Sequence, residues 1–479
     1  MKMSILIAVC FLSCLPLFES KGSAFYNVYP HKFPKISHRF GVDPGQPLFL
    51  TPYIESGQIE KARQLSRVGP LGEVNLESYS GFFTVNKTYN SNMFFWFFPA
   101  QENPENAPVV LWLQGGPGGS SLFGLFVEHG PLMVTKDGKV MLRDITWNKK
   151  YSMIYIDNPV GTGYSFTEVD AGYATNEADV GRDLYSCLYQ FFTVFSEYQK
   201  NDFYATGESY AGKYVPAISY YIHMKNPTAA MKINLKGMAI GDGLTDPETM
   251  MSEYATFLYS VGLLDENQRA YFQSMTDMAV AYIRDKQFLK AFQIFDSLFN
   301  GYLIKYPSYM YNVTGTKNYY NFLLTEKPAD FNYYGSFITS PEVRRSIHVG
   351  NLTYNDVQEV KKHLLNDVMD TVKPWVSVLM ENYKVMFYSG QLDIIIAVPL
   401  TEAFILSIPW SGQDMYRTVD KQIWKINPND TEVAGYVRQV KNFYQVIVRG
   451  AGHILPYDQP ERGWDMIQRF IEDRSFSRQ

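Results

Sequence analysis

One short stretch restricts the fold of this chain more than any other: a serine between a predicted strand and a predicted helix. Residues 203–206 form an apolar run typical of a buried strand, and residues 213–224 favour a helix. Between them lies Gly207-Glu208-Ser209-Tyr210-Ala211-Gly212. The small residues around Ser209 permit a sharp turn that would hold its hydroxyl out at the end of a strand. We therefore predict an exposed serine nucleophile here, with an ordinary Gly/Ser turn as the alternative.

Apolar runs alternate with helical patterns along the rest of the chain. Residues 79–85 and 92–98 are separated by a polar segment and predict a hairpin. Continuous apolar runs, typical of buried parallel strands, occur at 108–113, 153–156, 235–240, 385–388 and 445–448. This alternation predicts an α/β fold with a mostly parallel central sheet covered by helices. Within this class, a serine at a strand-to-helix turn predicts the α/β-hydrolase fold.

The segment between the runs at 235–240 and 385–388 has a different texture. Residues 265–298 carry one long helical pattern, and residues 304–331 are rich in Tyr and Asn. We expect a largely helical insertion that covers the active site as a lid. By contrast, Pro34, Pro44, Pro47 and Pro52 break any long element in residues 24–63, which read as irregular. The expected organisation is a leader at 1–22, hydrolase core at 23–245, the insertion at 246–374 and the rest of the core at 375–479.

The N-terminus predicts a secretory signal peptide, because Lys2 is followed by a short apolar stretch that ends by Phe18. No later stretch reaches the ~18 apolar residues of a membrane span. The leader and four glycosylation sequons agree on the secretory pathway, which leads to secretion or to an acidic lumen such as the lysosome. The sequon asparagines are Asn86, Asn312, Asn351 and Asn429. Without the leader only Cys187 remains, on an apolar helical stripe at 178–198, so no intramolecular disulfide is possible.

Composition and net charge limit the classes of partner that the chain can bind. The 479 residues are 19% charged and 16% aromatic, which is globular rather than disordered. A net charge of −5, without any basic run, argues against nucleic acid. The sequence leaves the oligomeric state open, a homodimer included.

Two further residues complete a catalytic triad in the chain order of α/β-hydrolases, which is Ser, acid, His. Asp393 lies just beyond the run at 385–388, and His453 lies in a glycine-flanked loop beyond the run at 445–448. None of the other six histidines has that setting. We predict that Ser209, Asp393 and His453 form the triad. For Asp393 or His453 alone, a capping aspartate or an ordinary loop histidine is the alternative.

A glycine run follows the strand predicted at 108–113. Residues 115–119 read Gly-Gly-Pro-Gly-Gly, and no Gly-Lys-Ser/Thr follows, which excludes a Walker phosphate loop. The position fits the hydrolase loop that supplies one oxyanion N–H, the second coming from the residue after the nucleophile. This nominates Gly116 and Tyr210, with a flexible turn as the alternative.

These motifs, with Trp112 and Leu113 ahead of the glycine run, resemble the serine carboxypeptidase family. Residues 113–121 and 156–163 are most similar to its vitellogenic-carboxypeptidase-like branch, and the likeness covers nearly the whole chain after the leader. It implies an exopeptidase that releases C-terminal residues from peptides through an acyl-enzyme, with peptide or protein C-termini as substrate, no cofactor and no metal. We expect an acid-side pH optimum.

The resemblance also implies a pocket for the substrate's terminal carboxylate. Its residues would be Trp112, Gln114, Gly115, Glu128 and Glu208, with the two glutamates sharing a proton. The family commonly has Asn where this chain has Gln114, so substrate preference is expected to differ. Two other functions remain open: an esterase or acyltransferase on the same scaffold, and a catalytically weak binding protein.

Overall fold

The computed structural model describes residues 42–304 and 306–476, so the predicted leader at 1–22 lies outside the described residues. Ten strands form one sheet in the order β1-β2-β6-β3-β7-β8-β9-β12-β11-β10. The five neighbouring pairs from β6 to β12 are parallel, and the pairs at both edges are antiparallel. The strands of this sheet are β1 (Tyr79–Asn86), β2 (Ser91–Phe98), β3 (Val109–Leu113), β6 (Ser152–Ile156), β7 (Phe203–Glu208), β8 (Leu235–Gly241), β9 (Lys384–Gly390), β10 (Gln422–Trp424), β11 (Gly435–Val440) and β12 (Phe443–Val448). A separate hairpin pairs β4 (Leu132–Val134) with β5 (Val140–Leu142).

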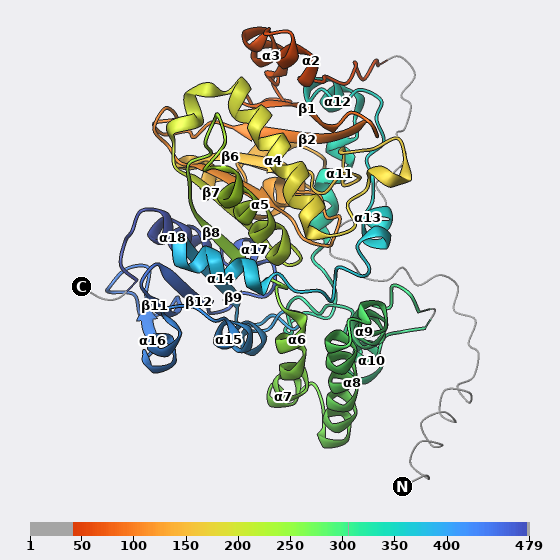
Figure 1. Ribbon diagram of the computed structural model, residues 1–479, viewed down its shortest axis with the longest axis vertical. Helices are drawn as coiled ribbons and strands as arrows, with labels where there is room; N and C mark the ends of the chain where they lie inside the picture. Colours follow the sequence, from red (N-terminus) through yellow and green to blue (C-terminus); the bar gives the residue numbers. More distant parts are fainter. Residues whose placement is uncertain (1–41, 305, 477–479) are drawn as a thin grey trace.

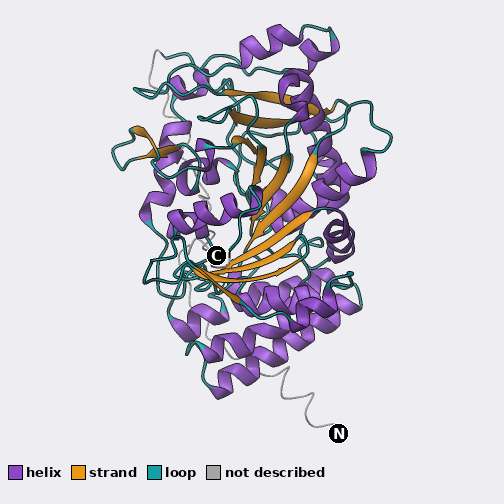
Figure 2. Ribbon diagram, turned by 90° about the vertical axis from the view of Figure 1, so that its left-hand side faces the viewer, coloured by secondary structure: helices purple, strands orange, loops and turns teal. Residues whose placement is uncertain are grey.

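Alternate side chains of the central strands enter two different apolar cores, which explains why these runs are continuously apolar. On β3, Leu111 and Leu113 belong to one core, and Val110 and Trp112 belong to the other. Successive residues of a strand point to opposite faces, so both faces of the sheet are buried. Helices cover both faces, as Figure 2 shows with the sheet turned toward its edge.

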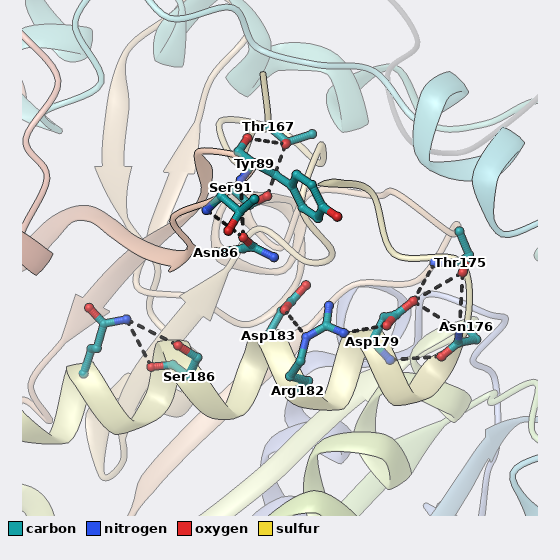
Figure 3. A network of polar contacts seen from close by, with 12 residues as sticks. Asn86, Tyr89, Ser91, Thr167, Thr175, Asn176, Asp179, Arg182, Asp183 and Ser186 are labelled. Atoms are coloured by element: carbon teal, nitrogen blue, oxygen red, sulfur yellow. Dashed lines mark hydrogen bonds and ion pairs between the residues drawn. The ribbon is translucent and has the colours of Figure 1, made fainter. Parts of the chain in front are cut away.

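One face is covered mainly by α4 (Glu177–Val194) and α5 (Ala211–Lys225), which pack on each other beside α14 (Lys373–Asn382). The Asn176 side chain caps α4 by accepting a hydrogen bond from the Asp179 amide at 3.0 Å. Arg182 then bridges Asp179 and Asp183 in the first turns (Figure 3). Cys187 lies on the apolar stripe of α4 and is fully buried, as expected from its helical spacing.

Between β8 and β9 the elements of the described residues are helices, joined by several long loops. Helices α6 to α10 gather at one end of the molecule, and α11 to α13 run back along its side (Figure 1). Their bounds are α6 (Pro247–Met250), α7 (Tyr254–Ser260), α8 (Glu266–Arg284), α9 (Phe288–Phe295), α10 (Tyr309–Thr314), α11 (Tyr333–Ile338), α12 (Pro341–Ser346) and α13 (Gln358–His363). The remaining helices are α2 (Thr51–Glu55), α3 (Ile59–Ser66), α15 (Val398–Ser407), α16 (Gln413–Thr418), α17 (Leu455–Asp458) and α18 (Pro460–Ile471).

Two local predictions were wrong. The pattern at 265–298 is not one helix, because the chain turns after Arg284 and Lys286 adopts a left-handed φ of 56° before α9 begins. The α8 and α9 helices then pack against each other, which a continuous helix could not do. The described part of this range, residues 42–63, is also less irregular than its prolines indicated, because Pro52 lies in the first turn of α2, where its missing N–H costs no hydrogen bond.

Among the described residues, no helix combines the length and the apolar character needed to cross a lipid bilayer. Three of the sequon asparagines, Asn312, Asn351 and Asn429, are exposed. Asn86 is half-buried at the β1–β2 turn, where its side-chain oxygen, Oδ1, accepts hydrogen bonds from the backbone amides of Thr88 and Tyr89.

Candidate active site

The parallel strands bring three predicted catalytic residues to one edge of the sheet. Ser209 follows β7 directly, Asp393 lies three residues beyond β9, and His453 lies five residues beyond β12. The loops after β9 and β12 also bond to each other, since the amide of Leu392 donates to the carbonyl of Ala451 at 2.8 Å. Carboxyl ends of parallel strands meet at one edge, which is the usual place for a site in such a sheet.

Ser209 occupies a strained turn. Its φ of 63° is in the left-handed region, which a serine adopts only when the surrounding structure imposes it. Two hydrogen bonds hold the turn: the Ser209 amide donates to Gly241 at 2.9 Å, and its carbonyl accepts from the Leu244 amide at 3.0 Å. Gly207 has no room for a side chain, because a Cβ there would lie 2.4 Å from the carbonyl oxygen of Leu113. The small residues of the motif therefore serve this turn.

Asp393 and His453 form a buried pair. His453 Nδ1 lies 2.8 Å from Asp393 Oδ2, and neither side chain is exposed. The other ring nitrogen, Nε2, has no hydrogen-bond partner among the described residues, so no bond from the Ser209 hydroxyl to it is recorded. Such a bond often forms only in the substrate complex. The Asp393 carboxylate is itself fixed by the amides of Ile395 and Ile396, at 2.8 and 3.2 Å.

The insertion supplies Tyr320 to this site, a contact that no sequence pattern indicated. The Tyr320 ring lies 4.7 Å from the His453 ring, centroid to centroid. The His453 amide also donates to the Tyr320 carbonyl oxygen at 2.6 Å. No motif marks Tyr320, since this segment has many tyrosines and only the tertiary contact distinguishes it.

The glycine run lies against the nucleophile turn. A Cβ on Gly115 would be 2.4 Å from the Tyr210 nitrogen and 2.6 Å from the Ser209 Cβ, so no side chain fits at this position. Gly116, with a φ of 123°, also needs glycine. The run is anchored on its far side, because the Ser120 hydroxyl donates to Asp157 at 2.5 Å. The backbone at Gly115 is therefore in contact with the serine turn, and Gly116 is the next residue of the run.

Three residues of the predicted carboxylate pocket form one buried chain of hydrogen bonds. Trp112 Nε1 donates to Gln114 Oε1 at 2.8 Å, and Gln114 Nε2 donates to Glu208 Oε1 at 2.6 Å. Glu128 reaches this group from a π-helical turn at Gly124–Glu128. Such turns are frequent at functional sites. The longer side chain of Gln114 thus spans the distance from the indole to a carboxyl group.

The two glutamates cannot both be charged here. Glu128 is 1% exposed and Glu208 is fully buried. Burial raises the pKa of both carboxyls, and the charge of Glu128 raises the pKa of Glu208 further. The nearby Arg143 acts in the opposite direction on Glu128, but its guanidinium is committed to the carbonyls of Phe126 and Gly130. The pair therefore holds at least one proton over the acid and neutral range.

A buried ion pair, which the sequence did not reveal, lies below the nucleophile turn. Lys213 on α5 is 0% exposed and lies 3.4 Å from Asp367 Oδ2. The same carboxylate accepts a hydrogen bond from the Tyr210 hydroxyl at 2.5 Å. Lys213 also donates to the carbonyl oxygens of Asp367 and Asp370. This cluster ties the residue after the nucleophile to the segment that leads into α14.

We expect Lys213→Met to destabilise the protein by about 3–5 kcal/mol, because it leaves the Asp367 carboxylate buried without its cation. The exposed pair Lys236–Asp202, 3.5 Å apart, provides the matched control. Lys236→Met should cost about 0–1 kcal/mol. Chemical denaturation followed by tryptophan fluorescence measures both. Equal losses for the two variants would show that the buried pair is not important for stability.

The sheet, the serine turn and the buried Asp–His pair define an α/β-hydrolase with a serine-type site. A family model described as serine carboxypeptidase matches residues 70–473, and the chain belongs to that family. It is 59% identical to a human protein described as probable serine carboxypeptidase CPVL, over 90% of each chain. It is 47% identical to the venom serine carboxypeptidase of Apis mellifera, over 96% of this chain and 98% of the relative.

A solved structure agrees on the fold. The crystal structure of a prohormone-processing carboxypeptidase from Saccharomyces cerevisiae superposes with a TM-score of 0.72. The superposition covers 86% of this chain and 96% of the yeast chain, at 23% sequence identity. The α/β-hydrolase fold expected from the sequence is thereby confirmed, as is the resemblance to serine carboxypeptidases. The chain is a serine-type carboxypeptidase, and the comparisons do not favour the esterase or binding-protein alternatives.

Proposed function

We propose that the site at this sheet edge releases C-terminal amino acids from peptides with Ser209 as the nucleophile. His453 Nε2 takes the proton of the Ser209 hydroxyl as the oxygen attacks the scissile carbonyl carbon. Asp393 keeps the other imidazole nitrogen, Nδ1, as the hydrogen-bond donor, which leaves Nε2 as the acceptor. His453 then returns the proton to the leaving amine, and water hydrolyses the acyl-enzyme by the same route in reverse.

The backbone amides of Gly116 and Tyr210 would stabilise the oxyanion of both tetrahedral intermediates. Their support is the contact between the glycine run and the serine turn, where a Cβ on Gly115 would lie 2.4 Å from the Tyr210 nitrogen. Removing one donor from such a hole typically costs about 10²–10³ in rate.

The observation that carries the exopeptidase assignment is the buried carboxyl pair beside the nucleophile. Glu208 immediately precedes Ser209, and its carboxyl is joined through Gln114 to Trp112. A protonated Glu128–Glu208 pair can donate a hydrogen bond to the free carboxylate of a substrate. An internal peptide bond offers no such group at that distance from the scissile carbonyl. The direct experiment incubates the purified protein with an N-blocked dipeptide and measures release of the C-terminal amino acid.

We expect kcat/KM on peptides to be bell-shaped, with its maximum on the acid side of neutrality. The raised pKa of Glu128 and Glu208 means that the pair keeps its proton at acid pH and loses it only as the pH rises. Substrate carboxylate binding therefore weakens toward alkaline pH, while protonation of the base sets the acid limb. In the double variant Glu128→Gln, Glu208→Gln the donors remain but cannot ionise. Its alkaline limb should flatten while its acid limb stays.

An alkaline limb that is unchanged in the double variant would contradict a role of the pair in binding. Glu177→Gln is a suitable control, because Glu177 is also buried and has a raised pKa. Its neighbour is Asp367, below the nucleophile turn, and not the carboxylate pocket. That variant should keep the wild-type profile.

We also propose that the protein follows the secretory route to secretion or to an acidic lumen, with residues 246–374 as the lid. Exposure of Asn312, Asn351 and Asn429 supports glycosylation at these sites. An acid-side optimum would suit a lysosomal setting.

A further inference from the structure

A third carboxyl group, Asp242, lies beside the catalytic pair, and the mechanism above gives it no role. It follows β8 directly, in the sequence Gly241-Asp242-Gly243, between the strand ends that carry Ser209 and Asp393. Its side chain is fully buried, and its φ of 44° is left-handed. No motif in the sequence pointed to this residue.

Hydrogen bonds fix Asp242 on one side only. Its amide donates to the Tyr388 carbonyl oxygen at 2.8 Å, and its Oδ1 accepts from the Gly390 amide at 2.9 Å. Its other carboxyl oxygen, Oδ2, is buried and has no hydrogen-bond donor among the described residues. A buried oxygen without a donor is costly, unless that oxygen carries a proton and is itself the donor.

The acceptor for such a proton is close by. One carboxyl oxygen of Asp242, one of Asp393 and one ring nitrogen of His453 all lie within 4.8 Å of one another. Asp393 already has three donors around it, the amides of Ile395 and Ile396 and the Nδ1 of His453. Burial raises the pKa of Asp242 well above its usual range, and the charge of Asp393 and a hydrogen bond with it act in the same direction.

The other ionisable groups around Asp242 do not oppose this. Asp458 on α17 and Glu208 on β7 are acids, and Tyr388 on β9 is a neutral phenol. Within the described part of the chain, no lysine or arginine forms an ion pair with Asp242. The Gly390 amide, which donates to Asp242 Oδ1, acts to lower the pKa of Asp242, but burial and the charge of Asp393 outweigh it.

We propose that Asp242 is a positioning residue that carries a proton on Oδ2 and donates it to Asp393, so that the two carboxyls place a single negative charge beside His453. The inference rests on the proposed triad. A hydrogen bond from Asp242 partly neutralises the negative charge of Asp393. Asp393 then stabilises the imidazolium form of His453 less than an unshared carboxylate would. The imidazole is then free to accept the serine proton at a lower pH than beside an unshared carboxylate, which extends catalysis into the acid range.

The test compares two variants by the acid limb of kcat/KM on an N-blocked dipeptide. Asp242→Asn keeps an acceptor for the Gly390 amide, keeps a donor for Asp393 and tolerates the left-handed φ. It should leave the midpoint of the acid limb within about 0.3 pH units, and kcat/KM within about threefold. Asp242→Leu has a similar shape but no donor. It should raise the midpoint by about one unit, which loses about tenfold at acid pH and is recovered toward neutrality.

Two results would overturn the proposal. A lower midpoint in Asp242→Asn would show that wild-type Asp242 is ionised, since removing a negative charge disfavours the imidazolium. Equal midpoints in Asn and Leu variants would show that no donated bond matters. A purely structural role would lower activity in the Leu variant at every pH alike.

Infrared difference spectroscopy of wild type against Asp242→Asn provides a readout besides activity, and it holds even if the Leu variant does not fold. It should show the carbonyl band of one protonated carboxyl group in the wild type, and only ionised-carboxylate bands would refute the proposal. To separate this band from Glu128 and Glu208, both proteins also carry Gln at those positions. Failure of the triad itself would appear separately, as activity that survives Ser209→Ala while the infrared band persists.

Discussion

Replacing Ser209 by alanine should reduce kcat by about 10⁴–10⁶ and abolish labelling by a fluorophosphonate probe. The serine oxygen forms the acyl-enzyme, and without it only oxyanion stabilisation and substrate binding remain, which in serine hydrolases leave a small residual rate. The φ of 63° holds this hydroxyl at the end of β7, and the buried pair of His453 and Asp393 lies at the same sheet edge. Release of the C-terminal residue and probe labelling are measured on the same preparation.

Ser219→Ala is the matched control for this experiment. Ser219 lies on α5, the helix that begins after the nucleophile turn, and its hydroxyl is buried without a hydrogen-bond partner in the described residues. The variant should keep full labelling and near wild-type activity. If instead the Ser209 variant were still labelled and active, another residue would be the nucleophile and the proposed site would be wrong.

The second large effect concerns the substrate. A peptide with a free C-terminal carboxylate should be cleaved about 10⁴–10⁵ times better, in kcat/KM, than the same peptide with a C-terminal amide. A site built to hydrogen-bond one polar group rejects an analogue that leaves its buried groups mismatched. Here the amide NH₂ would meet the protonated Glu128–Glu208 pair, where an acceptor is required. The measurement uses a matched pair of N-blocked dipeptides at one acid pH.

A methyl ester of the same dipeptide separates recognition from leaving-group reactivity. Cleavage at its C-terminal ester would report only the nucleophile and oxyanion hole, since an ester there carries no carboxylate. Comparable rates on the free acid and the amide would contradict the carboxylate pocket and favour an endopeptidase or esterase role of the same triad. In the Glu128→Gln, Glu208→Gln variant at acid pH, the preference should persist, because two amide donors replace the protonated pair.

Much of the fold could be predicted from local patterns. The apolar runs that predicted strands all appear in the large sheet within a few residues of their expected ends. Both faces of that sheet are buried at its centre, so its central strands are apolar at most positions and stand out in the sequence. The same local logic located Ser209, because a strained turn between strand and helix requires small neighbours.

Other features could not be predicted, because they depend on contacts between distant segments. The break between α8 and α9 depends on the packing of the two helices, and helical periodicity alone continues through it. No motif marks three residues that the structure places at the site. Arg143 lies near the Glu128–Glu208 pair, Tyr320 contacts the imidazole of His453, and Lys213 lies below the nucleophile turn.

The sequence by itself determined which residue types stand at the ends of the strands, and therefore the serine, the aspartate, the histidine and the glycine run. Only the tertiary structure decided the electrostatic state of the site. Whether a carboxyl is charged depends on its burial and on neighbours contributed by other strands and helices. Glu128 and Glu208 are 80 positions apart, and Asp242 and Asp393 are 151 apart. The two carboxyls of each pair lie close together and away from water only in the folded structure, where the parallel sheet and its covering helices bring them together.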